Sequence, residues 1–449
     1  MFSFKAVSGR VLWQMLTIGL CTGIVKIAGA AKVVYSAKAF GVSDGADAYF
    51  IAFLVVAFFG DTLAGSLHSA LLPTFVEARE REGIGVAQRL YQSVMARATA
   101  LLALLALALF FTAHWAMRPF ASSFDAPKFA LTCSLFRVML PMMPIAAIAT
   151  VWRSVLNTDE RFALPAIAPA ATPLVTIAFL LWFSQSWGIY SLAVGSTAGA
   201  VIEGSMLAAL MLRRGFAISP RWHRRTAAFT QVLAQYWPVV AGIFLLGGAP
   251  LIDQSIAAML GAGSVSALQY GTRVTVVLTA IGPSAVATAI FPHFSKLVVD
   301  GADVRHSLRS YAAIILAVSI PAIAILIAIT EPIVRFFFER GEFDPAATHV
   351  VASVQRFSLL QLPAAMVMAL VLRLISSLKA NHLLLGAAAL FAILNLSLDL
   401  ALSRFMGVSG IALSSAITQL ITMLYLVAVI RTRLPDSLNL SPSREAVSR

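Results

Sequence analysis

The sequence predicts an all-α polytopic membrane protein, with about twelve transmembrane helices in two six-helix lobes related by a pseudo-two-fold axis along the membrane normal. Hydrophobic residues make up 59% of the 449 residues and charged residues only 12%, which is too little charge to keep a soluble surface hydrated. Apolar runs of about 20 residues recur along the whole chain. The pattern of these runs also repeats once, in the second half of the chain.

The first half contains six apolar runs bounded by polar residues, Gly or Pro. We expect the first run to stay in the membrane, because it is long, carries Lys26 and Lys32, and lacks the small-residue cleavage site of a signal peptide. Leu72-Pro73 ends the second run, and Gly188 opens the sixth. The predicted helices lie near 11–39, 47–72, 94–117, 129–156, 163–184 and 188–212.

The second half contains six further runs, and Gly407 opens the last of them. Prolines such as Pro321 and Pro363 lie inside these runs, where they free backbone carbonyls and allow the helix to bend. Such bends suit two lobes that rock against each other. The predicted helices lie near 230–260, 264–296, 307–330, 346–378, 382–403 and 407–431.

Positive charge gathers in every second connection, whereas the alternate connections 41–46, 185–187, 261–263 and 404–406 are short and nearly free of Lys and Arg. The positive-inside rule therefore places both termini in the cytoplasm, and it accounts for most of the net charge of +13. The longest outward connection, 331–349, carries charges of both signs and is interpreted as a solvated cap rather than a substrate gate. The basic connections contain Arg79, Arg81, Arg89, Arg161, Arg213, Arg214, Arg221, Arg224, Arg225, Lys296, Arg305, Arg309 and Lys379.

Two pairs of landmarks define the repeat. The segments 72–75 and 291–294 end helices 2 and 8, and Gly188 and Gly407 open helices 6 and 12. Each pair is separated by 219 residues (292 − 73 and 407 − 188). Since each half has an even number of helices, both halves enter the membrane with the same orientation. The predicted parts are an N-terminal lobe at 1–212, a cytoplasmic basic linker at 213–229, a C-terminal lobe at 230–431 and a cytoplasmic tail at 432–449.

Ionisable side chains lie inside these apolar helices, where an ionised group costs about 2.5–3.5 kcal/mol on insertion scales. So many charges indicate a hydrated or paired interior, and hence a transport path between the lobes near the middle of the membrane. The basic members outnumber the central acidic ones, which predicts a net positive cavity suited to an anionic lipid headgroup. The charged residues are Lys26, Lys32, Asp61, Glu203, Asp253, Arg273 and Arg356.

Counted depth brings some of these charges together. Lys26 and Asp61 each lie fourteen residues from the outer ends of their helices, about 21 Å deep, so we expect that they can pair. Asp47, Asp61 and His68 fall within about 60° on one stripe of helix 2. This stripe is either part of the path or a hydrogen-bonded seam between helices.

The charges of the second half and of helix 6 have alternative roles. Asp253 and Arg273 lie at depths that allow contact, and Arg356 lies at a similar depth. Both arginines either line the path or form buried ion pairs that fix the helix register. Glu203 is either protonated or coupled to a cation, so Glu203 and Asp253 are the candidate ion-coupling residues. Arg153 lies near a helix end and is expected to snorkel.

No motif for soluble catalysis or for a cofactor occurs in the sequence. It contains no G-x-x-x-x-G-K-[ST] loop for ATP, no H-E-x-x-H for zinc and no G-x-S-x-G elbow. We therefore expect a transporter without enzyme activity, cofactor or metal, with energy from an ion gradient or the membrane potential. Cys21 and Cys133 are interpreted as packing residues. No basic, aromatic-interleaved module that would bind nucleic acid is present.

A succession of short landmarks runs through nearly the whole chain. They are Lys38-Ala39-Phe40-Gly41 with 46–53 and Leu72-Pro73, then 157–162 with 165–169, then 263–266 with Tyr270 and Arg273, and last 339–343. In this order they resemble the MurJ/MviN-type lipid II flippases. The resemblance implies a member of the multidrug/oligosaccharidyl-lipid/polysaccharide exporter superfamily, with two six-helix lobes around a cationic cavity. Proteins of this family flip undecaprenyl-diphosphate-linked saccharide from the cytoplasmic to the periplasmic leaflet.

The resemblance also implies roles for single residues. Lys26 and Lys32 match cavity arginines of helix 1, Asp47 matches the helix 2 aspartate, and Arg273 matches the helix 8 arginine. Because lysine lacks the bidentate fork of arginine, we expect diphosphate capture to be less geometrically specific here. We also expect twelve helices, whereas the lipid II flippases usually carry two more. Basic residues of the family on helix 2 are replaced by Leu54, Gly60 and Asp61.

We therefore expect a flippase of the bacterial inner membrane for polyprenyl-diphosphate-linked saccharide, with lipid II first and an exopolysaccharide or O-antigen repeat unit second. Outward movement of each negative charge is favoured by about 2.3 kcal/mol per 100 mV. Its other partners would be membrane lipids and, for ion-driven transport, a coupling cation. The predicted cavity residues are Lys26, Lys32, Asp47, Asp61, Arg273 and Arg356.

Two alternatives belong to other classes. One is a cation-coupled multidrug exporter, and the other is a non-transporting scaffold that recruits cell-wall enzymes through its basic loops. A pump for cationic drugs needs a net acidic cavity, whereas the central charges here are mainly basic. The candidate proton or sodium sites of the exporter are Asp47, Asp61, Glu203 and Asp253.

Overall fold

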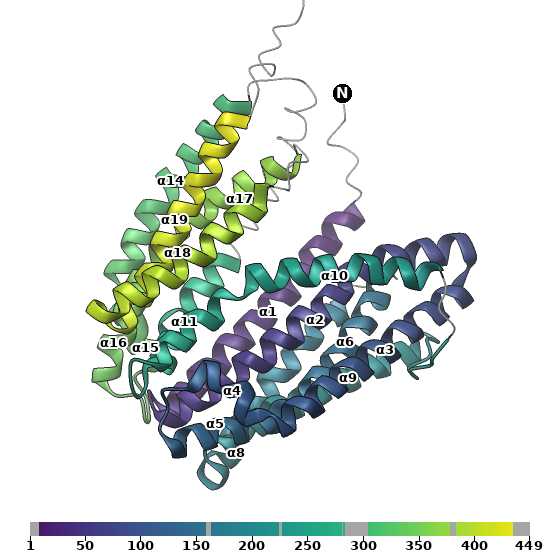
Figure 1. Ribbon diagram of the computed structural model, residues 1–449, viewed down its shortest axis with the longest axis horizontal. Coiled ribbons are helices and arrows are strands. Elements are labelled where there is room, and N and C mark those ends of the chain that lie inside the picture. The colour runs from purple at the N-terminus through teal and green to yellow at the C-terminus, as the bar shows by residue number, and fades with distance from the viewer. Residues whose placement is uncertain are drawn as a thin grey trace, which may run out of the picture. The chain divides into compact units, whose positions relative to one another are not determined.

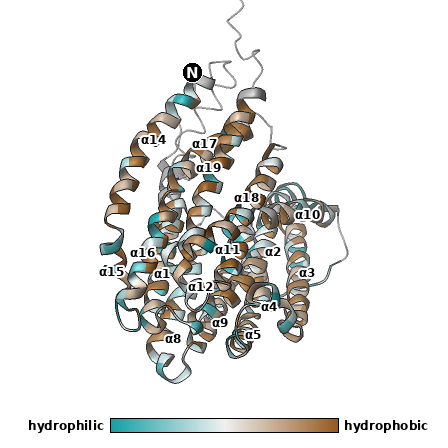
Figure 2. Ribbon diagram, turned by 60° about the vertical axis from the view of Figure 1, so that its left-hand side comes forward, coloured by the Kyte–Doolittle hydropathy of each residue, from teal (hydrophilic) through white to brown (hydrophobic). Residues whose placement is uncertain are grey.

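The computed structural model describes residues 9–158, 163–223, 227–280, 282, 304–377 and 383–433, and these residues form α-helices joined by short connections (Figure 1). Eleven helical spans in this described part are long and apolar enough to cross a membrane. Apolar residues cover most of the length of these helices (Figure 2). The predicted all-α polytopic membrane fold is confirmed.

The helices group into two compact units. Unit 1 comprises residues 1–266 and 340–343, and unit 2 comprises residues 267–339 and 344–449. Unit 1 contains α1 (Gly9–Phe40), α2 (Asp44–Glu82), α3 (Ile84–Phe111), α4 (Ala113–Ala121), α5 (Ala126–Met139), α6 (Met142–Asn157), α7 (Ala163–Ile167), the 3₁₀ turn η2 (Ala168–Ala170), α8 (Ala171–Trp187), α9 (Tyr190–Arg213), α10 (Ala227–Gly247), α11 (Ala249–Ala258) and the start of α12 (Ser264–Gly271). Unit 2 contains α14 (Val304–Ala328), α15 (Thr330–Phe338), α16 (Pro345–Leu359), α17 (Leu362–Ser377), α18 (Leu383–Met406) and α19 (Val408–Arg433).

The same order of elements recurs in the two halves of the chain. In each half a long helix is followed by a short helix and then by a broken pair: α3, α4, α5 and α6 in the first half, and α14, α15, α16 and α17 in the second. The predicted helix 129–156 is divided at Leu140-Pro141, and the predicted helix 346–378 is divided just before Pro363. A proline removes a backbone donor and crowds the preceding turn, which explains a break at both places.

Several predicted boundaries differ from the observed ones. The connection 331–349, expected to be a solvated cap, is mostly helical, because α15 occupies Thr330–Phe338 and α16 begins at Pro345. Unit 1 includes α10 and α11, which the repeat assigns to the second lobe. The predicted lobes are defined by the sequence repeat, whereas the two units are defined by packing, so the lobe boundaries stay a prediction. Parts of the predicted helix 264–296, the linker residues 224–226, the landmark 291–294 and the tail after residue 433 lie outside the described residues.

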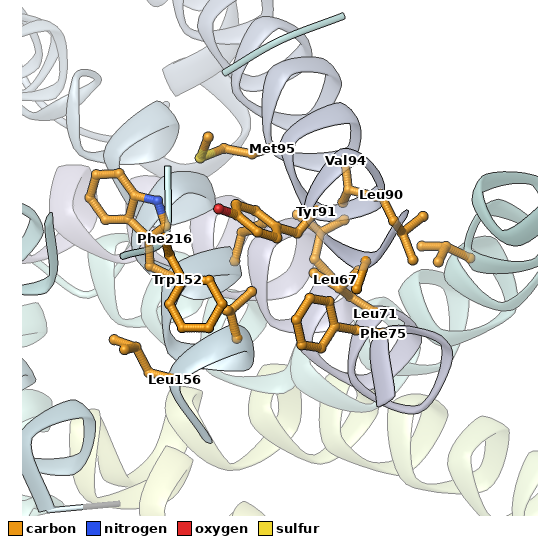
Figure 3. Packing of buried hydrophobic residues seen from close by; sticks show 14 of the residues in the cluster. Leu67, Leu71, Phe75, Leu90, Tyr91, Val94, Met95, Trp152, Leu156 and Phe216 are labelled. Carbon is orange, nitrogen blue, oxygen red and sulfur yellow. The ribbon is translucent and has the colours of Figure 1, made fainter. Parts of the chain in front are cut away.

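The apolar core of unit 1 lies where α2, α3 and α6 meet (Figure 3). Tyr91 is fully buried there, and its ring contacts Phe75 and Phe216 edge-on. The Tyr91 hydroxyl donates to the carbonyl of Ala217 at 2.8 Å, so the segment after α9 is fixed to α3. This close packing gives the neighbouring polar side chains of α2 and α6 defined positions.

Helices α8 and α9 approach closely because small residues line their contact. A Cβ atom at Gly199 would lie 2.6 Å from the Cα atom of Thr172, so only glycine fits this crossing. Gly195, one turn earlier, also has no room for a larger side chain against α8. The close approach brings Thr172 within hydrogen-bonding distance of Glu203, one turn further along α9.

Candidate functional site

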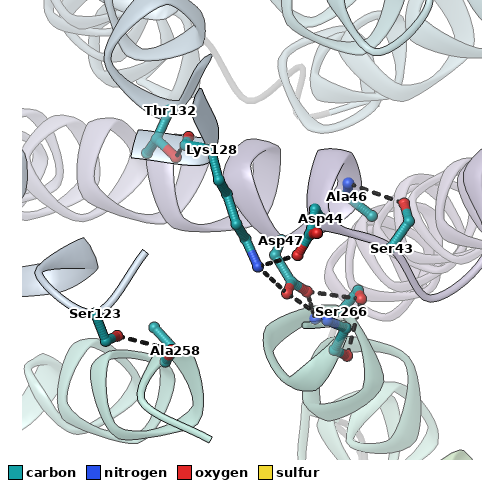
Figure 4. Close-up of polar contacts among 10 residues, drawn as sticks. Ser43, Asp44, Ala46, Asp47, Ser123, Lys128, Thr132, Ala258 and Ser266 are labelled. Atoms are coloured by element: carbon teal, nitrogen blue, oxygen red, sulfur yellow. Dashed lines mark hydrogen bonds and ion pairs between the residues drawn. The ribbon is translucent and has the colours of Figure 1, made fainter. Parts of the chain in front are cut away.

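The first polar network lies at the start of α2. Ser43 caps this helix, because its Oγ accepts from the amide of Ala46 at 3.3 Å. Asp47, one turn on, is completely buried, and its Oδ2 pairs with Lys128 Nζ of α5 at 2.8 Å. Lys128 also contacts Asp44 Oδ1 at 2.5 Å and is itself only 7% exposed (Figure 4). One buried ammonium thus joins the ends of two helices.

Asp47 also binds the chain around the start of α12 (Figure 4). Its Oδ2 accepts from the amide of Gly263 at 2.7 Å, and its Oδ1 accepts from the amide and hydroxyl of Ser266 at 2.7 and 2.8 Å. A carboxylate at a helix N-terminus satisfies free N–H groups and is favoured by the helix dipole. These contacts occupy both oxygens, so Asp47 acts here as a positioning residue. Its predicted contact with substrate stays a prediction.

The end of α1 is fixed in a similar way. Gly41 has a φ of +55°, a conformation that other residues rarely adopt, and a Cβ atom there would collide with the carbonyl of Glu342. The amide of Glu342 in turn donates to the carbonyl of Lys38 at 3.0 Å. The landmark segment 340–343 therefore packs directly against the end of α1 within unit 1.

Lys32 on α1 is held by neutral groups. Its Nζ donates to the Tyr49 hydroxyl at 3.3 Å and lies 4.4 Å from the ring centroid of Phe53. The Tyr49 hydroxyl continues to Ser196 Oγ at 3.0 Å, and Ser196 contacts Thr176 at 3.4 Å. This chain of hydrogen bonds links α1, α2, α9 and α8. Among the described residues, no carboxylate pairs with Lys32.

Lys26, two turns earlier on α1, is exposed, and so is Asp61 on α2. In the described part of the chain no ion pair joins them, so the expected Lys26–Asp61 pair is not formed. The reason is that α1 packs mainly against α8 rather than against α2. Equal depth in two helices does not determine which faces of those helices meet.

Arg153 on α6 lies among acidic groups of two other helices. Its NH1 group is 3.7 Å from Glu203 Oε1 on α9, and its NH2 group is 3.4 Å from Thr150 Oγ1. The second oxygen of Glu203 accepts from Thr172 Oγ1 at 3.2 Å. The Arg153 charge also acts electrostatically on Asp61. Arg153, expected to snorkel, is therefore directed toward carboxylates.

His68 borders this group of charges. Its Nδ1 hydrogen-bonds with Ser154 Oγ of α6 at 2.8 Å, while the Ser154 hydroxyl donates to the carbonyl of Thr150. The polar stripe of α2 is thus a hydrogen-bonded seam at His68 and part of a charge cluster at Asp61. The interpretation of Asp61 as part of a transport path stays a prediction.

In unit 2, Arg356 on α16 donates to Glu331 Oε2 of α15 at 3.0 Å. Because the side chains of Arg356 and Glu331 are 42% and 28% exposed, this is not the buried ion pair of the register-fixing alternative, and the role of Arg356 stays a prediction. Arg273, just after α12, is half-buried, and its Nε has no hydrogen-bond partner among the described residues. Asp253 is half-buried on α11 of unit 1. The predicted roles of Arg273 and Asp253 stay predictions.

Two basic residues of these networks were not assigned to the site from sequence. Lys128 follows Pro127 at the start of an apolar run, where a lysine commonly marks a helix end. Arg153 lies four residues before the end of α6, which suggested snorkelling. Neither position carries a signal of its own, because the partners Asp47 and Glu203 lie on other helices.

Comparison with known proteins identifies the family of this chain. Residues 36–442 match the sequence model of the family described as "Lipid II flippase MurJ". The chain belongs to this family. It is 27% identical over 432 residues to the probable lipid II flippase MurJ of Rhizobium meliloti, covering 93% of this chain and 80% of the relative. It is also 27% identical to the lipid II flippase MurJ of Burkholderia cenocepacia, covering 76% of this chain and 68% of the relative.

Solved structures show the same fold. A structure of lipid II flippase MurJ in an inward closed conformation superposes with a TM-score of 0.81 at 23% identity, covering 93% of this chain and 87% of that one. An inward-facing multidrug transporter of the MATE family superposes with a TM-score of 0.74 at 13% identity, covering 93% of this chain and 96% of that one. The resemblance seen in the sequence is confirmed, and the chain is a multi-pass protein of a transporter family of the bacterial inner membrane.

Proposed function

We propose that the chain flips undecaprenyl-diphosphate-linked saccharide, with lipid II as the first candidate, from the cytoplasmic to the periplasmic leaflet by alternating access. The observation that carries this proposal is the environment of Lys32. Its ammonium lies within a membrane-spanning helix, and its described contacts are a hydroxyl and two aromatic rings. A charge at this depth requires a counter-ion, and no carboxylate in the described residues supplies it. The diphosphate of a lipid-linked saccharide supplies it.

Two other basic residues support an anionic cargo. Lys26 lies less than two turns from Lys32 on α1 and is exposed, without an ion pair among the described residues. Arg273 retains a buried Nε–H group without a partner in the described part of the chain. The named relatives, probable lipid II flippases from several bacteria, support lipid II over other glycans.

The direction of transport follows from charge. A diphosphate carries about two negative charges, and each gains about 2.3 kcal/mol per 100 mV when it leaves a negative-inside cell. The gain of about 4.6 kcal/mol per 100 mV makes ATP unnecessary. The proposal includes cytoplasmic termini, which fusions of reporter enzymes to both ends would test. Glu203 and Asp253 are kept as candidate ion-coupling residues.

The test is rescue of a bacterium depleted of its own lipid II flippase. We expect the wild-type gene to rescue growth, and Lys32→Met, Lys26→Ala and Arg273→Ala to fail at equal membrane abundance. Lys38→Met is the matched control, because Lys38 is an exposed lysine at the end of the same helix. Its variant should rescue like the wild type.

Three outcomes contradict the proposal or part of it. No rescue by the wild type, together with loss of a surface polysaccharide on deletion in the host, would replace lipid II with another lipid-linked glycan. Full rescue by Lys32→Met would show that the unpaired ammonium does not bind the cargo. Drug efflux without rescue would favour the exporter alternative.

A further inference from the structure

We propose that Arg153 of α6 binds the cargo diphosphate, and that in the empty protein it is held ready by the carboxylates of Glu203 and Asp61. This inference rests on the proposed function and extends it to a residue that lies outside the expected cavity set. The supporting observations are the weak contacts of the guanidinium, the matched depth of its acidic neighbours and the geometry of the arginine fork.

The guanidinium of Arg153 uses little of its hydrogen-bonding capacity. It carries five N–H donors, and its described contacts are a 3.7 Å approach to Glu203 and a 3.4 Å contact with Thr150. A committed Arg–carboxylate pair is usually bidentate with bonds near 2.7–2.9 Å. The Arg153 side chain is also 31% exposed, whereas Glu203 is 13% exposed. A loosely held, accessible guanidinium has room for a ligand with several acceptor oxygens.

The acidic neighbours lie at one level of the membrane. Gly45 of α2 packs against Ile189 at the start of α9, so these two residues mark a common level. Asp61 lies sixteen residues after Gly45, which places it about 24 Å along α2 from this level at 1.5 Å per residue. Glu203 lies fourteen residues after Ile189, which places it about 21 Å along α9. Both carboxylates therefore lie well inside the membrane at similar depth.

The charges of this cluster explain how Arg153 is kept in place without cargo. One guanidinium lies near two carboxylates, so its positive charge remains neutralised when one of the carboxylates moves away. An arriving diphosphate offers several oxygens in the geometry that an arginine fork binds bidentately. Arg153 can then exchange Glu203 for phosphate while Asp61 remains beside it. The lysines of α1 cannot provide this fork, because each is a point charge.

The experiment measures binding of undecaprenyl diphosphate and undecaprenyl phosphate to the purified full-length chain in detergent, by native mass spectrometry. We expect Arg153→Met to weaken undecaprenyl diphosphate binding on the order of 10- to 100-fold, the size of a lost charge-assisted hydrogen-bonded pair. Arg153→Lys keeps the charge but not the fork, and it should lose much of the preference for diphosphate over monophosphate. Glu203→Gln removes the competitor for Arg153 and should leave diphosphate binding equal or tighter.

A double variant separates binding from folding. Arg153→Met with Glu203→Gln removes both members of the buried pair and leaves only the exposed carboxylate of Asp61, so its melting temperature should return close to that of the wild type. We expect its diphosphate binding to stay as weak as in Arg153→Met alone. Wild-type binding by a stable double variant would overturn the inference, because Arg153 would then be only the counter-ion of Glu203.

The same measurements distinguish failure of this inference from failure of the proposed function. A wild-type chain that binds undecaprenyl diphosphate equally well with and without Arg153 contradicts the inference alone. A wild-type chain that does not bind undecaprenyl diphosphate contradicts the proposed function and the inference together. Arg153-dependent binding without rescue of a lipid II flippase contradicts only the choice of glycan.

Discussion

Replacing Asp47 tests how the ends of α2, α5 and α12 are held together. Asp47→Ala removes a carboxylate that pairs with Lys128, which is 7% exposed, and that accepts from two backbone amides and a hydroxyl. Removing one partner of a buried ion pair costs about 3–5 kcal/mol, and unpaired buried N–H groups add about 1–3 kcal/mol each. Asp44 still contacts Lys128, and Ser266 can turn its hydroxyl to the Gly263 carbonyl. We therefore expect Asp47→Ala to lower the free energy of unfolding by about 3–5 kcal/mol in total.

The matched control is Asp44→Ala. Asp44 binds the same ammonium, but its side chain is 57% exposed, so its loss should cost about 0–1 kcal/mol. The assay is reversible unfolding in mixed detergent micelles, where about 3 kcal/mol corresponds to a more than 100-fold change in the unfolding equilibrium constant. Lys128→Met should cost less than Asp47→Ala, because Asp47 keeps its three donors from Gly263 and Ser266. Equal losses for Asp44→Ala and Asp47→Ala would refute the reasoning.

Three further changes test other parts of unit 1. Tyr49→Phe removes the hydroxyl between Lys32 and Ser196, which costs about 1 kcal/mol of stability. We expect transport to fall several-fold while the melting temperature changes little. An unchanged transport rate would show that Tyr49 does not position Lys32. Gly199→Ala forces α8 and α9 apart and should lower the melting temperature. The control is Gly60→Ala, which should stabilise α2 by about 0.5–1 kcal/mol, because a Cβ atom there meets nothing within 4 Å. Equal effects of the two substitutions on the melting temperature would contradict the close crossing. Gly41→Ala should destabilise the contact with 340–343, visible as faster proteolysis there, and no change would show that the chain relaxes without cost.

The sequence determines the number and nature of the long helices well, because an apolar run of about 20 residues has few alternatives in a membrane. It also contains the repeat, and the order of elements around α5 and α16 confirms that both halves share one pattern. Short elements are harder to predict. α15 lies in a charged connection, and its i,i+4 pairs of Arg335 with Glu331 and Glu339 stabilise a helix that hydropathy does not reveal.

The polar contacts were predictable only in part. Residue counting gives the depth of a charge but not the helix that it faces, which is why Lys26 and Asp61 were expected to pair. Lys32 is a predicted site residue because of its position in an apolar helix, yet its partner Tyr49 looks like an ordinary aromatic residue in sequence. Arg153 and Glu203 are 50 residues apart and lie on separate helices, so no local pattern joins them.

Replacing Asp61 tests whether the placement of cations near Arg153 determines binding of the diphosphate. The carboxylate of Asp61 adds a negative charge that repels a diphosphate. Arg153 lies on α6, which packs against α2, and it adds a positive charge that interacts electrostatically with that of Asp61. If cation placement rather than helix identity matters, Asp61→Arg should restore diphosphate binding to the Arg153→Met variant. Restoration by Asp61→Arg but not by Asp61→Asn would show that a guanidinium is required, whereas equal restoration by both would mean that relief of repulsion is sufficient.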